Sequence, residues 1–96
     1  MVRQLINDNG NPAANQFVIN TSNAVYFQSY DSVVCKVKGG QVTLSDFWDY
    51  SNTTRKHLYI FLRSQGYRGL NSAKEVRLAI AKGIVKLSPT PSLKVS

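Results

Sequence analysis

Hydrophobic and polar residues alternate in short runs between Phe17 and Phe27. Phe17 and Ile19 are predicted to share one face of a strand, because successive side chains of a strand point to opposite faces. The polar residues 21–23 then favour a turn, after which Val25 and Phe27 resume the same face. This pattern predicts two neighbouring strands joined by a short turn.

A regular alternation follows in residues 33–38, where two lysines lie on the side opposite the apolar residues. The side predicted to face the core holds Val33, Cys35 and Val37. Gly39–Gly40 comes next, and two glycines readily adopt the positive φ angles of a tight hairpin turn before residues 41–44. We therefore expect an antiparallel meander of three or four strands over residues 17–44, with one apolar face and one wet face.

The apolar spacing changes to that of a helix after Ser51. Residues 52–65 place Leu58, Phe61 and Leu62 on one side of a helix. The hydroxyl of Ser51, or that of a nearby threonine, is suited to accept a hydrogen bond from the free backbone N–H groups at the helix start.

A second helix is predicted over residues 73–82. Ser72 and Glu75 form the S-x-x-E pattern of a capping box. Val76 and Ala79 then recur at helical spacing, which gives the helix an apolar side to pack against the sheet.

These elements predict a single α+β domain over residues 17–87, in which the antiparallel sheet is covered on one face by two C-terminal helices. Residues 84–87 are interpreted as a short edge strand or an extended arm. The Asn-rich residues 1–16 are predicted to be a lead-in loop, and the Pro-containing residues 88–96 a flexible or surface-bound tail. A chain of 96 residues buries only about 60 to 65% of its unfolded surface, so this core needs most of its large apolar residues.

Positive charge is concentrated in the second half of the chain. Residues 1–50 have a net charge of −1, whereas residues 51–96 have a net charge of +8. Such asymmetry favours an anionic partner, because phosphate contacts release condensed counterions. The alternative is that the surplus charge only keeps a small protein soluble.

The basic side chains of the two predicted helices and their link are the strongest candidates for a binding surface. They would contact the phosphates of DNA or RNA, or an acidic patch on a protein. If the helices pack side by side, several of these charges share one face; otherwise they form an ordinary solvated helix surface. The candidate residues are Arg55, Lys56, Arg63, Arg68, Lys74, Arg77 and Lys82.

Catalytic and metal-binding patterns are weak. His57 is the only histidine and has no set of ligand partners, so no metal site is predicted. Asp46 and Asp49 are explained more simply as helix-start residues than as an acid and base. Cys35 alternates into the predicted core, where a thiol is usually inert. We therefore expect no enzymatic activity and no cofactor.

The aromatic residues Phe47, Trp48 and Tyr50 allow two interpretations. Exposed, they would form a stacking platform for bases. Buried, they would anchor the start of the helix to the sheet, and this second role is the expectation for Phe47 and Trp48.

No membrane segment is predicted. The longest run of large apolar or aromatic residues is Leu58–Leu62, far shorter than the roughly 20 residues of a membrane span. The N-terminal residues also lack the apolar segment of a secretory signal. A cytoplasmic location is therefore expected.

Three sequence elements resemble a group of short uncharacterised proteins encoded by bacteriophages. They are N-Q-F at residues 15–17, Y-F-Q-S-Y at residues 26–30, and W-D-Y-S at residues 48–51, which the pair Thr53–Thr54 follows. The resemblance spans residues 15–62 and carries no known activity. It implies a phage origin and the cytoplasm of an infected bacterium as the place of action.

These observations lead to a ranked set of functions. The first is a small non-enzymatic phage accessory protein that binds nucleic acid through its basic helical half. The alternatives are an inhibitor or modulator of a host defence or transcription complex, and a virion-associated structural protein. A homodimer formed through an exposed strand edge is a further possibility.

Overall fold

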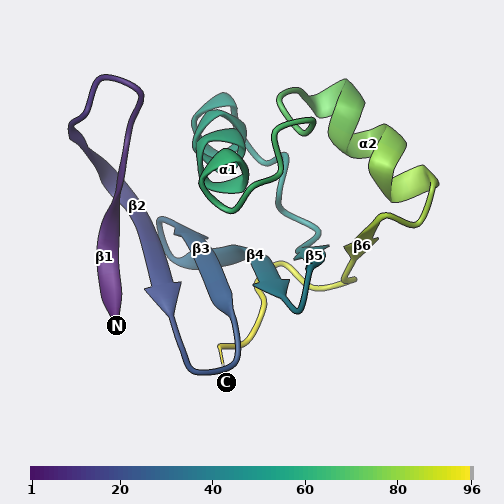
Figure 1. Cartoon of the computed structure of the whole chain (residues 1–96), viewed down its shortest axis with the longest axis horizontal. Coiled ribbons are helices and arrows are strands. Elements are labelled where there is room, and N and C mark those ends of the chain that lie inside the picture. Colours follow the sequence, from purple (N-terminus) through teal and green to yellow (C-terminus); the bar gives the residue numbers. More distant parts are fainter. Residues whose placement is uncertain (96) are drawn as a thin grey trace.

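The computed structural model of the protein describes residues 1–95 and consists of one sheet with two helices on one side of it (Figure 1). The strands are β1 (Val2–Ile6), β2 (Pro12–Asn20), β3 (Val25–Ser29), β4 (Ser32–Lys38), β5 (Gln41–Leu44) and β6 (Val85–Leu87). The helices are α1 (Asn52–Ser64) and α2 (Ala73–Ala81).

The strands follow one another across the sheet in chain order. Each pair from β1 to β5 is antiparallel, and β6 joins β5 in parallel after the chain has passed through both helices. The predicted α+β class is therefore confirmed. The sheet has six strands rather than the expected three or four, because it extends at both edges beyond the predicted meander.

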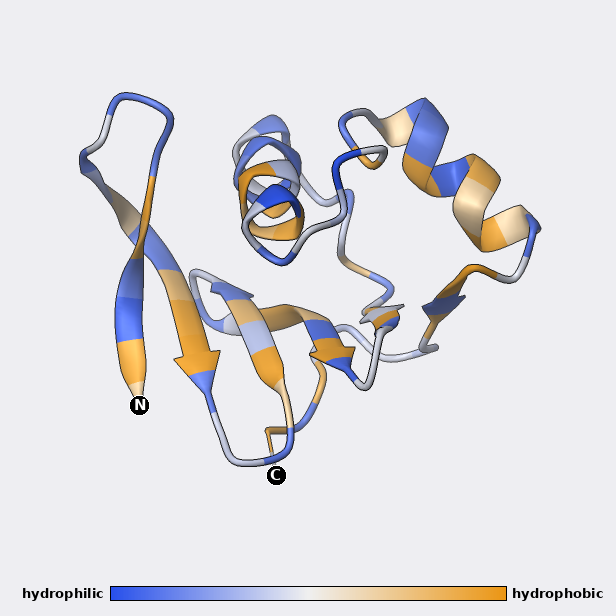
Figure 2. Cartoon of the chain, viewed as in Figure 1, coloured by the Kyte–Doolittle hydropathy of each residue, from blue (hydrophilic) through white to orange (hydrophobic). Residues whose placement is uncertain are grey.

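The N-terminal edge corrects the prediction of a lead-in loop over residues 1–16. This segment forms β1 and the first part of β2, and Leu5 and Ala13 are buried. At the tip, Asn7 Oδ1 accepts hydrogen bonds from the backbone N–H groups of Asn9 and Asn11. The asparagines thus shape a hairpin turn, which Figure 2 shows as a hydrophilic loop.

The phase of β2 also differs from the prediction. Val18 is fully buried, whereas Phe17 and Ile19 are only partly buried. Asn20 pairs with Val25 across a turn of the residues 21–24, so odd-numbered residues of β2 lie opposite even-numbered residues of β3. Phe17 and Phe27 therefore cannot share a face, and it is Val18 that lies opposite Phe27 in the main core.

A β-bulge breaks the predicted alternation in β4. Phe27 pairs with Cys35 and Gln28 with Val33, which leaves Val34 as an extra residue in the ladder. Val34 and Cys35 both enter the main core, while Val33 joins a second cluster on the opposite face. The expected common face of Val33, Cys35 and Val37 is therefore wrong. The Gly39–Gly40 turn is confirmed, with φ angles of 57° and 79°.

Both helices begin at serine caps, and their bounds lie within one residue of the prediction. Ser51 Oγ accepts a hydrogen bond from Thr54 N–H, and Ser72 Oγ accepts one from Glu75 N–H. In α1 the residues buried against the sheet include Leu58 and Phe61, and the Phe61 ring stacks on Phe27 with ring centroids 5.6 Å apart.

The described part of the C-terminal tail lies against the sheet on the side away from the helices (Figure 1). Leu93 N–H donates to Val33 O, and Val33 N–H donates to Ser92 Oγ. Leu93 also packs against the second cluster, which contains Ala24, Tyr26 and Val33. These contacts correspond to the surface-bound alternative for residues 88–95, and Ser96 lies outside the described residues.

Candidate functional site

A shallow groove runs along the solvent side of α1, and we call it the basic groove. Its volume is about 460 Å³. It is lined by Asp8, Asn52, Arg55, Lys56, Tyr59, Arg63 and Asn71. Its helical members recur at the spacing of one α-helix face, so the groove is a direct product of the sequence of α1. The predicted residues Arg55, Lys56 and Arg63 are thereby brought together.

Arg77 joins this group from α2 through a shared partner, Asp49. Arg55 Nη1 donates to the backbone oxygen of Asp49 at 3.1 Å, and Arg55 Nη2 donates to Asn52 Oδ1. Arg77 Nη2 lies 3.2 Å from Asp49 Oδ2, and its guanidinium carbon lies 5.5 Å from the centre of the Trp48 ring. Asp49 therefore connects the start of α1 to α2, which places Arg77 near the groove.

Arg63 closes the other end of the basic groove through an ion pair with Asp8. Its Nη2 lies 3.0 Å from Asp8 Oδ1, and both side chains are well exposed. Exposed ion pairs stabilise proteins by only about 0 to 1 kcal/mol. The pair of Arg63 with Asp8 therefore contributes little to stability.

Tyr59 lies between these charges. Partial burial raises the pKa of the Tyr59 phenol, and the nearby Arg55 and Arg77 act in the opposite direction. At neutral pH the phenol keeps its proton and can donate a hydrogen bond within the basic groove.

The remaining predicted basic residues do not line the groove. Arg68, in the link between the helices, is exposed, and so is Lys74, which is one helical turn before Arg77. Lys82 caps the C-terminus of α2, about 140° around the helix from Arg77 at 100° per residue. Lys82 therefore faces away from Arg77.

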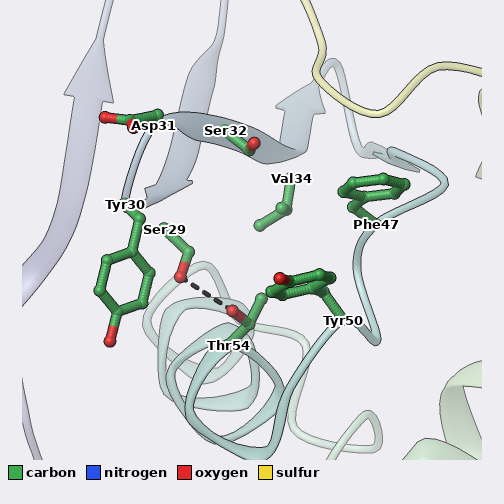
Figure 3. A pocket seen from close by; sticks show the side chains of 8 residues that line it. All are labelled: Ser29, Tyr30, Asp31, Ser32, Val34, Phe47, Tyr50 and Thr54. Atoms are coloured by element: carbon green, nitrogen blue, oxygen red, sulfur yellow. Dashed lines mark hydrogen bonds between the residues drawn. The ribbon is translucent and has the colours of Figure 1, made fainter.

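A second hollow, the aromatic cleft, opens on the other side of the start of α1 (Figure 3). Its volume is about 440 Å³. It is lined by Ser29, Tyr30, Asp31, Ser32, Val34, Phe47, Tyr50 and Thr54. None of these lining side chains is a lysine or an arginine, so its chemistry differs from that of the basic groove.

The expectation that Phe47 and Trp48 are both core residues is only half correct. Trp48 is 4% exposed, whereas Phe47 is 44% exposed and Tyr50 is 75% exposed. The Phe47 and Tyr50 rings stack with centroids 5.6 Å apart and an interplanar angle of 13°. Figure 3 shows them on one side of the aromatic cleft, with Tyr30 on the other side.

The floor of the cleft is a chain of hydroxyl groups. Ser51 Oγ donates to Thr54 Oγ1 at 3.2 Å, and Thr54 Oγ1 lies 3.0 Å from Ser29 Oγ. Opposite Ser29 in the sheet is Gln16, which is fully buried. Among the side chains that the structure describes, the buried N and O atoms without a hydrogen-bond partner are those of the Gln16 amide.

Tyr30 occupies a strained backbone conformation at the rim of the cleft. Its φ is 54°, which is uncommon for a bulky residue. Tyr30 N–H donates to Asn15 O, and Tyr30 O accepts from Gln28 Nε2, both at 2.7 Å. These bonds hold an exposed aromatic ring in a conformation that a free turn would avoid.

Other reactive side chains have structural surroundings. Burial raises the pKa of the Cys35 thiol, which stays protonated at neutral pH. His57 Nδ1 lies 2.8 Å from Thr53 O within the helix. Over residues 1–95 no group of three His, Cys, Asp or Glu side chains is arranged to hold a metal ion. Neither of the described helices is long and apolar enough to cross a membrane.

Comparison with known proteins identifies a family. No curated protein and no solved structure matches the chain. A family model matches residues 1–78, a range that contains every lining residue of both hollows and ends within α2. The chain therefore belongs to DUF8033, a family of unknown function.

Proposed function

We propose that the protein binds nucleic acid through the basic groove and performs no chemistry on it. The observation that carries this proposal is the convergence of Arg55, Lys56 and Arg63 in one groove, with Arg77 linked to it through Asp49. A groove that tracks a chain of phosphates needs several cations in a row with neutral donors between them. Tyr59 and Asn71 are such donors in the groove wall.

The state of the arginines supports a phosphate ligand. Arg55 is held in place by Asp49 and Asn52, so little side-chain entropy remains to be lost when a phosphate binds. Arg63 already binds a carboxylate in its ion pair with Asp8. A guanidinium that accommodates two carboxylate oxygens also suits two phosphate oxygens.

The proposal includes a biological setting. The resemblance of the segments N-Q-F, Y-F-Q-S-Y and W-D-Y-S to phage-encoded proteins supports an accessory protein that acts in the cytoplasm of an infected bacterium. Recovery of its gene from phage genomes, next to genes for replication or host takeover, would strengthen this setting.

The test is a titration of labelled single-stranded and duplex DNA and RNA with the protein over a series of salt concentrations. We expect binding at low salt that weakens steeply as salt rises, with each phosphate contact adding roughly 0.7 to 0.9 to the slope of log K against log salt. No binding of any of these probes at low salt would remove the proposal.

Charge reversal at one residue locates the site. Lys56→Glu is expected to weaken binding roughly tenfold or more, because it replaces a groove cation with an anion. The matched control is Lys38→Glu, an exposed lysine beside the Gly39–Gly40 turn that lines neither hollow. Equal losses in the two variants would mean that net charge, not the basic groove, attracts the probe.

A further inference from the structure

We propose that the aromatic cleft receives an unpaired nucleobase, so that the protein prefers single-stranded over duplex nucleic acid. This inference rests on the proposed function, since the same strand would lie with its phosphates in the basic groove. It assigns a second site with a different ligand chemistry to residues that play no part in the charge argument.

The ring arrangement suits a planar ligand. Phe47 and Tyr50 lie nearly parallel on one side of the cleft, and Tyr30 lies on the other, while the hollow between has a volume of about 440 Å³. Tyr50 and Tyr30 are 75% and 51% exposed, so both rings are accessible to a ligand. Aromatic rings on which bases stack are a recurring feature of single-strand binding sites.

The charge of the cleft favours a base over a phosphate. Its lining carries the Asp31 carboxylate and no basic side chain, so a phosphate would find no cation there and would be repelled by Asp31. The Asp31 carboxylate lies at the rim and points away from the rings of Phe47 and Tyr50 (Figure 3), so it repels phosphate from the cleft without contacting a base between the rings.

The hydroxyl floor can complete such recognition. Thr54 Oγ1 accepts from Ser51 Oγ, and in the 3.0 Å pair of Thr54 Oγ1 and Ser29 Oγ either hydroxyl can donate, so Ser29 can offer a base either a proton or a lone pair. Gln16, whose buried amide atoms have no partner among the described residues, lies directly opposite Ser29. Buried polar groups without hydrogen-bond partners are rare in folded proteins, so the Gln16 amide beside Ser29 calls for a functional explanation.

The two hollows are close enough to share one strand. Thr54 lines the aromatic cleft while Asn52 and Arg55, on the same first turn of α1, line the basic groove. This turn contains no acidic side chain, and the partial positive charge of a helix N-terminus therefore lies between the hollows. A strand can pass over the turn with a phosphate near the groove and the neighbouring base in the cleft.

The test compares a single-stranded oligonucleotide with one of equal length that contains abasic sites. The two probes carry the same phosphates, so the basic groove alone would bind them equally. We expect the wild-type protein to bind the complete oligonucleotide roughly 5- to 150-fold more tightly, which is the range that one stacked base contributes. Equal affinity for the two probes would overturn the inference and leave the proposed function intact.

Variants at Tyr50 locate the base. Tyr50→Leu should lower the affinity for the complete oligonucleotide and leave the affinity for the abasic one unchanged, whereas Tyr50→Trp should retain the preference because it retains a stacking ring. Tyr50 is so exposed that neither change disturbs the core. A 2-aminopurine probe should also lose fluorescence on binding wild type but not Tyr50→Leu.

The outcomes separate the two proposals. If wild type binds neither probe at low salt, the proposed function fails and this inference fails with it. If wild type and Tyr50→Leu bind both probes alike with a steep salt dependence, the basic groove still binds phosphates. Only the proposal that the aromatic cleft binds a base is then refuted.

Discussion

The two hollows beside the start of α1 are nearly equal in volume, about 460 and 440 Å³, but opposite in chemistry. The basic groove gathers arginine and lysine side chains from one face of a helix. The aromatic cleft gathers rings and hydroxyls from two strands, two turns and the helix start, and it contains a carboxylate instead of a cation. In the two proposals made above, the first turn of α1 separates the surface assigned to phosphates from the surface assigned to a base.

The comparison also concerns mobility. The groove side chains are long and mostly exposed, and their ion pairs are weak. The cleft is fixed by buried hydroxyl bonds and by a strained turn at Tyr30. We infer that the exposed Lys56 and Arg63 side chains can adjust to several ligand positions, whereas Arg55, held by Asp49 and Asn52, and the aromatic cleft are more rigid.

Weakening the packing of α1 on the sheet should affect both hollows, because both are built on this helix. Phe61 is fully buried and stacks on Phe27. Phe61→Ala is expected to lower the free energy of unfolding by about 3 to 5 kcal/mol, since it leaves a cavity between helix and sheet. Urea denaturation followed by circular dichroism measures this change. As a control, Leu78→Ala removes a 53% exposed residue of α2 and should change stability by at most about 0.5 kcal/mol.

A loss below about 1 kcal/mol for Phe61→Ala would contradict the packing described for α1. It would mean that the helix is held by its caps and links rather than by its apolar side. The apparent affinity for an oligonucleotide should fall as the folded fraction of Phe61→Ala falls, because both hollows depend on the position of this helix.

The predictable parts of the fold were those set by local sequence. The serine caps Ser51 and Ser72 and the glycine pair Gly39–Gly40 each act within a few residues, and these elements lie where the pattern predicts. The strand β1 was missed because it has one buried residue, Leu5, and is recognisable mainly through its pairing with β2. Such pairing depends on contacts between residues that are distant in the sequence, and the local spacing of hydrophobic residues does not reveal these contacts.

The candidate site divides in the same way. Helical spacing explains why Arg55, Lys56 and Arg63 lie in one groove, but the link through Asp49 to Arg77 depends on how the helices pack. The aromatic cleft joins Tyr30 to Tyr50 across twenty positions of chain, through the sheet and the helix cap. The sequence signal for the aromatic cleft is the group of aromatic and hydroxyl residues around Trp48. Sequence alone favoured burial of Phe47 and Trp48 over a binding role for this group.

The unpaired amide of Gln16 offers a second way to distinguish the role of the aromatic cleft from that of the basic groove. Gln16→Met has nearly the same volume and removes a buried polar group that lacks a partner among the described residues. We expect the free energy of unfolding to rise by about 1 kcal/mol or more, because the desolvation cost of the amide disappears. Thermal and urea denaturation measure the change.

The same variant tests whether the amide serves the cleft. If it supports base recognition near Ser29, Gln16→Met should be more stable yet discriminate less between complete and abasic oligonucleotides. Its salt dependence should equal that of wild type, since the basic groove is untouched. A destabilised variant would show that the Gln16 amide contributes to folding.

The smallest expected effect concerns the acidic residue of the basic groove. Asp8→Asn removes the carboxylate that pairs with Arg63 at 3.0 Å. Because an exposed pair contributes at most about 1 kcal/mol, the fold should be nearly as stable as before. The freed guanidinium should bind phosphate better, and we expect oligonucleotide affinity to rise roughly two- to fivefold at low salt, within that energy range. Fluorescence anisotropy measures it.

Asp46→Asn is the matched control, since it makes the same change in net charge at an exposed residue that lines neither hollow. A general attraction between the protein and the oligonucleotide would raise affinity equally in the two variants. A specific site predicts a larger gain for Asp8→Asn, and the gain should be the same for complete and abasic probes because phosphates alone meet Arg63. Equal gains in Asp8→Asn and Asp46→Asn would show that Arg63 has no particular role and would confine the basic groove to the start of α1.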